Sequence, residues 1–98
     1  MRNFGDFHET LQRYRDTLEE LMECQYGLLT KLTCRKVITH KQKSHIESSR
    51  DSYAQNKTLL DIMLLVTDQR KLEQFLEVLR LTNQRHIAAY ILNDGGTL

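Results

Sequence analysis

Apolar residues recur along most of the chain at helical spacing. Between residues 6 and 23 they are three or four positions apart: Phe7, Leu11, Tyr14, Leu18 and Leu21. This spacing predicts one amphipathic helix, because residues three and four positions apart share a helical face. Asp6 and Glu9 form a capping-box pattern at its start. The opposite face is mostly acidic and is therefore expected to be exposed to solvent.

Two short helices are predicted next. One covers about residues 25–35 and turns three leucines inward: Leu28, Leu29 and Leu32. The other begins at Thr39, which forms a capping box with Gln42, and runs to about residue 48. Its only large aliphatic anchor is Ile46, so this helix is expected to be marginal and largely exposed.

A fourth helix is predicted for residues 52–66, where Ser52 and Gln55 repeat the capping pattern. Its second half is apolar on nearly every side and is interrupted only by Asp61. A helix that is apolar all round belongs in the middle of a bundle.

Two last helices are predicted after caps at Thr67 or Asp68 and at Asn83, the second ending near Leu92. Their inward residues are Leu72, Phe75, Leu76 and Leu79, followed by Ile87, Ala88 and Ile91. No strand pattern competes with these helices. These patterns therefore predict an all-α chain, a bundle of six helices.

Composition agrees with one small helical domain. The chain has 98 residues, no proline and 4 glycines, and 40% of its residues are hydrophobic. One domain is expected over residues 1–93, followed at 94–98 by the start of a tail or linker, because the pair Gly95 and Gly96 favours a helix stop. Two cysteines, no apolar stretch near 18 residues and no signal-peptide pattern indicate a soluble chain in the cytoplasm, with no membrane partner.

Charge is strongly segregated although the net charge is only +1. Residues 1–23 hold three basic and six acidic side chains, whereas residues 24–50 hold six basic and one acidic. The candidate protein-binding residues are the acids Asp16, Glu19, Glu20 and Glu23 and the bases Lys31, Arg35, Lys36, Lys41 and Lys43, with Arg50 at the edge. Three interpretations remain open: a solvated surface, a nucleic-acid patch and a protein-docking patch.

Catalytic and metal chemistry find little support. Cys24, Cys34, His40 and His45 are too widely spaced for structural zinc, which usually needs a close cysteine pair. No phosphate loop or dinucleotide fingerprint is present. The aromatic residues are expected in the core: Phe7, Tyr14, Tyr53, Phe75 and Tyr90. We therefore expect no enzyme activity, no cofactor, no metal and no small-molecule substrate.

Residues 8–92 resemble a caspase recruitment domain. The resemblance rests on the order and spacing of several motifs, namely Leu59-Leu60-Asp61-Ile62-Met63, Phe75-Leu76-Glu77-Val78-Leu79, Thr82-Asn83-Gln84-Arg85-His86-Ile87-Ala88 and Val37-Ile38-Thr39. One departure is the turn after the fourth helix, residues 67–70, where many members have a glycine.

The resemblance implies an antiparallel six-helix Greek key of the death-fold superfamily, with a first helix that is often bent. It also implies homotypic binding of other recruitment domains, in some members as filaments that bring caspases or kinases together. In well-known pairs of this family a basic face on the first and fourth helices meets an acidic face on the second and third. Here the polarity is reversed, so the resemblance does not identify the partner.

The predicted function is thus recruitment of a signalling effector, a caspase or an adaptor, in apoptotic, inflammatory or defence signalling. The alternative is a small helical nucleic-acid-binding domain in which residues 31–43 contact phosphates. Overall neutrality and the acidic first helix oppose that alternative.

Overall fold

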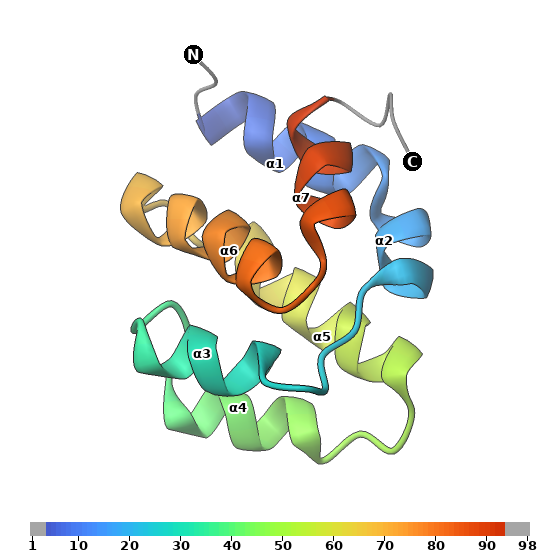
Figure 1. Cartoon of the computed structure of the whole chain (residues 1–98), viewed down its shortest axis with the longest axis vertical. Coiled ribbons are helices and arrows are strands. Elements are labelled where there is room, and N and C mark those ends of the chain that lie inside the picture. Colours follow the sequence, from blue (N-terminus) through green and yellow to red (C-terminus); the bar gives the residue numbers. More distant parts are fainter. Residues whose placement is uncertain (1–3, 94–98) are drawn as a thin grey trace.

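The computed structural model describes residues 4–93 and arranges them in helices without a strand (Figure 1). Seven helices lie in this range: α1 (Phe4–Arg13), α2 (Arg15–Leu21), α3 (Leu28–Cys34), α4 (His40–Glu47), α5 (Ser52–Leu64), α6 (Gln69–Leu81) and α7 (Arg85–Leu92). The all-α prediction is confirmed for these residues. The count differs from the predicted six because the first predicted helix is two. The predicted tail at 94–98 lies outside the described residues.

The first predicted helix divides at Tyr14, whose backbone leaves the helical region at φ −106° and ψ 20°. Tyr14 still donates a backbone hydrogen bond to Thr10 (3.0 Å), so the chain bends without a long interruption. Its ring meets that of Tyr90 on α7 edge to face, with 5.4 Å between centroids. Helix α1 begins at Phe4, and the side chain of Asp6, the predicted cap, lies outside the described residues.

Helix α3 begins at Leu28, later than the predicted start at about residue 25, because a turn precedes it. Tyr26 and Gly27 both adopt positive φ, 60° and 98°, and this left-handed pair separates the end of α2 from α3. The capping box of α4 is confirmed: the Gln42 backbone donates to the Thr39 hydroxyl (3.0 Å), and the Thr39 backbone donates to the Gln42 amide oxygen (2.9 Å).

The remaining caps differ in part from the sequence-based prediction. Asp51, not Ser52, caps α5 by accepting a hydrogen bond from the Ala54 backbone (2.7 Å). Asp68 caps α6, which agrees with one of the two predicted residues. Asn83 does not cap α7, because it adopts the left-handed conformation at φ 66°.

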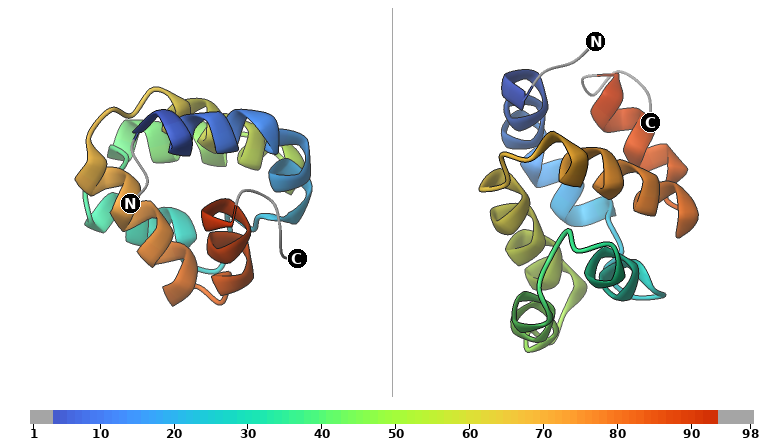
Figure 2. Two further views of the ribbon diagram at one scale, coloured as in Figure 1. Left: turned by 90° about the horizontal axis from the view of Figure 1, so that it is seen from above. Right: turned by 90° about the vertical axis from the view of Figure 1, so that its left-hand side faces the viewer.

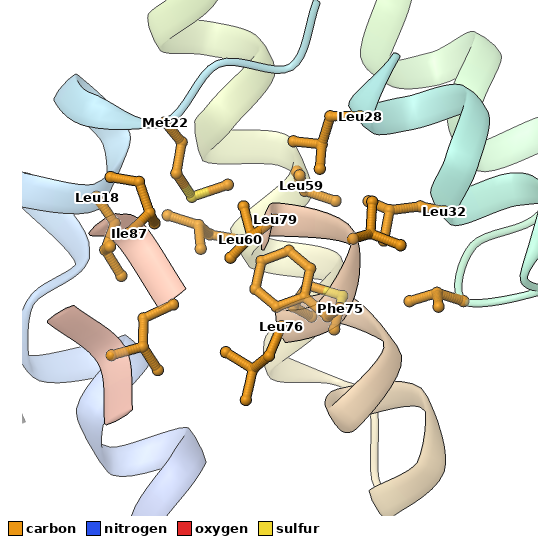
Figure 3. Packing of buried hydrophobic residues seen from close by; sticks show 14 of the residues in the cluster. Leu18, Met22, Leu28, Leu32, Leu59, Leu60, Phe75, Leu76, Leu79 and Ile87 are labelled. Carbon is orange, nitrogen blue, oxygen red and sulfur yellow. The ribbon is translucent and has the colours of Figure 1, made fainter. Parts of the chain in front are cut away.

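The core gathers around α5 and α6. Phe75 and Leu79 of α6 meet Leu59 and Leu60 of α5, and residues of the other helices close around them (Figure 3). The apolar second half of α5 is only partly enclosed, since Leu65 just after it is 82% exposed.

Helix α5 contacts α1, α2 and α4, whereas α6 contacts α3 and α7. Figure 1 and the right-hand view of Figure 2 show α1 and α7 at one end of the bundle and α3 and α4 at the other. Among the described residues, every helix is too short or too polar to cross a bilayer.

Candidate protein-docking surfaces

The acidic residues of α2 do not form the single exposed face predicted from sequence. Asp16 and Glu20 are exposed, and Glu23, just beyond the helix, is half-buried. Glu19 is buried, with 4% of its surface exposed. The prediction that Glu19 contacts a partner is therefore corrected, because its carboxylate has no open path to one.

Arg15 explains the burial of Glu19. Its Nε donates to the Glu19 carboxylate at 2.7 Å, and its Nη2 donates to Asp61 and to the Lys57 carbonyl (3.2 Å) on α5. The hydrogen bond with Glu19 raises the pKa of Arg15, although desolvation opposes this. The ion pair thus joins α2 to α5. The spacing of four between Arg15 and Glu19 is a sequence signal for their pairing, but nothing local indicates Asp61.

Asn56 on α5 holds the end of α2 in place. Its buried amide nitrogen donates to the carbonyls of Glu19 (2.8 Å) and Met22 (2.6 Å). Its oxygen accepts a hydrogen bond from the Cys24 thiol at 3.1 Å. The last carbonyls of a helix have no partner within the helix, so Asn56 supplies what the end of α2 lacks.

Gln84 makes a second such link, because its side chain exchanges two 2.8 Å hydrogen bonds with the Glu23 backbone. These contacts fix the direction in which Asp16 and Glu20 face outward.

Tyr53 belongs to the acidic surface rather than to the core. It lies in the first turn of α5 and is 50% exposed, contrary to the predicted buried position. Its pKa is raised, chiefly because its hydroxyl interacts with the Glu19 carboxylate, and further by the charges of Asp16 and Glu20. We define the acidic surface as Asp16, Glu20, Glu23 and Tyr53. Tyrosine suits such a place, because it is enriched at protein interfaces.

The basic residues lie on α3, just after its C-terminal end and on α4, and these two helices pack against each other. Lys31 on α3 and Lys41 on α4 are exposed. Lys43 forms an ion pair with Glu47 at 3.0 Å, which compensates part of its charge. We define the basic surface as Lys31, Arg35, Lys36, Lys41 and Lys43, the residues predicted from sequence.

Arg35 and Lys36 lie at the end of α3 and share a hollow with Arg70 and Lys71 of α6. These two α6 residues were not predicted from sequence, because about 35 positions separate them from Arg35 and Lys36.

The cysteines lie in different surroundings. Cys24 is buried, and burial together with the charge of Glu23 raises its pKa to about 12. Cys34 is exposed and borders a small hollow that His40 and Lys43 also line. Among the described residues, no three histidine, cysteine or acidic side chains are close enough together to hold a metal ion.

Comparison with known proteins identifies the family of the chain. Residues 8–94 match the family model of the caspase recruitment domain. A comparison with curated proteins gives no match. Recruitment domains are protein-interaction modules rather than enzymes, and they bind other domains of the death-fold class. Since the match covers nearly the whole chain, the protein belongs to the caspase recruitment domain family.

Proposed function

We propose that this chain docks onto other recruitment domains by pairing its acidic surface with a basic surface, on a second copy or on a different domain. The observation that carries the proposal is the separation of the two surfaces. The acidic surface lies on α2 and the start of α5, whereas the basic surface lies on α3 and α4. Helices α2 and α4 pack on α5 from different sides (Figure 1). One molecule can therefore present opposite charges to two neighbours at once.

Such docking is head-to-tail, because a surface on one molecule meets a different surface on the next. Contacts of this kind propagate as open helical filaments unless the rotation closes a ring. The effector brought to the assembly would be a caspase or an adaptor in apoptotic, inflammatory or defence signalling in the cytoplasm. The chain itself supplies binding and no catalysis.

We also propose that this chain has the six-helix Greek key of its family. We assign α1 and α2 together to the position of a single bent first helix, since the hydrogen bonds around Tyr14 continue from one to the other. On this assignment α3 to α7 take the five remaining positions.

Charge reversal tests the docking directly. One variant carries Asp16→Lys with Glu20→Lys, and the other carries Lys31→Glu with Lys41→Glu. Each variant alone presents two surfaces of the same sign, so self-association should weaken about tenfold or more, because several weak ion pairs become repulsive together. A 1:1 mixture should recover association, since each surface then meets its opposite. Light scattering and sedimentation at low and moderate salt measure both effects.

The control variant carries Glu73→Lys with Glu77→Lys. This pair has the same spacing of four and the same change in charge, but it lies on α6 outside the acidic surface. It should associate like the parent. Equal loss in the control and in the α2 variant would show that net charge, rather than a docking surface, governs association. Parent-like association of both docking variants would refute the proposal. Where the chain alone stays monomeric, the same variants are tested for binding to a partner recruitment domain.

A further inference from the structure

A cationic hollow lies between the end of α3 and the start of α6. It is lined by Arg35, Lys36, Asp68, Arg70, Lys71 and Gln74 and has a volume of about 490 Å³. Within residues 4–93, none of its four cations forms an ion pair with a carboxylate. Its one acid, Asp68, directs its carboxylate to the Arg70 backbone as the α6 cap (2.9 Å). Among the described residues, four cations and one acid line this depression, so its lining carries a formal excess of positive charge.

Lys36 occupies a position that usually belongs to glycine. Its φ is +61°, in the left-handed region. The backbone hydrogen bonds from Lys36 to Thr33 (3.0 Å) and from Val37 to Leu32 (2.9 Å) are those of a Schellman motif, which closes a helix and favours glycine at this point. A lysine here is strained, because a residue with a Cβ disfavours the left-handed conformation that glycine adopts freely. Strained residues cluster at functional sites, so the Lys36 side chain is a candidate for binding a ligand.

The charges in the first turn of α6 are opposite to those that a helix N-terminus favours. The first turn of α6 contains no acidic residue but carries Arg70 and Lys71. The positive end of the helix dipole lies there, so cations are disfavoured and anions are favoured. Arg35 reaches across from α3 and donates to the Gln74 amide oxygen at 2.7 Å. This exposed hydrogen bond holds the guanidinium beside Gln74, at the edge of the hollow.

We propose that the cationic hollow binds a compact polyanion carrying several phosphate groups, such as a free inositol phosphate or the headgroup of a phosphoinositide lipid. Phosphates match the arginine and lysine side chains of the hollow, because arginine forms bidentate hydrogen bonds with a phosphate and lysine binds it as a point charge. The volume falls in the range of small-molecule sites, about 300–1,000 Å³. All four cations line the same depression, which favours a compact ligand over an extended one. This proposal goes beyond the docking function and does not depend on it.

Calorimetry with inositol hexakisphosphate, on dilute monomeric protein, tests the site. The variant carries Lys36→Gly with Arg70→Ala, and the matched control carries Lys57→Ala with Arg85→Ala. Each removes one lysine and one arginine, and the control residues are exposed and lie outside the hollow. The hollow variant should bind about a hundredfold more weakly, since each lost charged contact is worth about tenfold. The control should stay within about threefold of the parent.

The thermal stability of the hollow variant shows whether weaker binding results from the lost cations or from unfolding. Lys36→Gly relieves the left-handed lysine, so the hollow variant should melt no lower than the parent. Reduced binding with unchanged or raised stability supports the proposal. Equal loss in hollow and control variants would overturn it, because general electrostatics would then suffice. No binding by the parent at low salt, to either ligand source, would overturn it too.

Vesicles distinguish the two ligand sources. Phosphatidylcholine vesicles with a small fraction of phosphatidylinositol 4,5-bisphosphate are sedimented with parent, hollow variant and control. Sedimentation of parent and control, but not of the hollow variant, assigns a lipid headgroup. Binding of the soluble inositol phosphate without vesicle binding assigns a free ligand. Tighter binding to a short DNA duplex, lost equally in both variants, would contradict a compact site and favour nucleic acid.

Discussion

Asn56→Ala should be among the more damaging polar substitutions in this domain. Asn56 has 1% of its surface exposed, and its amide nitrogen donates to two carbonyls, those of Glu19 and Met22. Removing the amide leaves both carbonyls buried without this donor, at about 1–2 kcal/mol each. The Cys24 thiol loses its acceptor as well, which adds little because thiols are weak donors. The expected loss is about 3 kcal/mol, a large part of the 5–15 kcal/mol typical of a domain.

Guanidinium denaturation followed by circular dichroism measures this loss, and the melting temperature should fall by roughly 15 °C. Gln55→Ala is the matched control on the same helix. Gln55 is also buried, but its amide makes one hydrogen bond, to the Ser49 carbonyl at 3.0 Å. Its loss should be about 1 kcal/mol. If Asn56→Ala costs no more than Gln55→Ala, the end of α2 does not depend on Asn56 and the reasoning is wrong.

Four further predictions concern the two thiols, a turn and the core. Because the pKa of Cys24 is raised from 9.0 to about 12, its contribution to stability should be full below pH 9 and lost as the pH rises from 9 to 12. Over that range the unfolding free energy of the parent should fall more steeply than that of Cys24→Ala, by up to about 1.4 kcal/mol per pH unit. In the native protein iodoacetamide should modify exposed Cys34 and spare Cys24, and equal rates would contradict the structure. Gly27→Ala should cost about 1–2 kcal/mol from its φ of +98° alone, since an added Cβ meets no atom within 4 Å. Phe75→Ala should lower the free energy of unfolding by about 3–5 kcal/mol in the same denaturation assay, because Phe75 is fully buried. A loss below about 1 kcal/mol would show that the position of α6 in the structure is wrong.

The sequence by itself determined the helices and most of the core. Leu72, Phe75 and Leu79 share one face of α6 by spacing alone, and they are buried. The capping box of Thr39 and Gln42 was also predicted from sequence, because its partners are three residues apart. These features depend on the helical period and on neighbours within one turn, which a single chain segment contains.

Only the tertiary structure decided which polar residues face outward. Glu19 lies next to exposed Glu20 in sequence, yet it is buried because Arg15 and Asp61 form an ion-pair network across α2 and α5. Tyr53 follows the inward spacing of α5, but it lies in the first turn, beyond the end of the core, and so remains half-exposed.

The cationic hollow is the clearest case of tertiary control. Lys36 and Lys71 are 35 positions apart, and only the packing of α3 on α6 brings them together. Helical periodicity relates residues within a segment, whereas the charge of a surface depends on which segments become neighbours. The physical reason is that many distant apolar contacts jointly choose those neighbours, and no local pattern contains that choice.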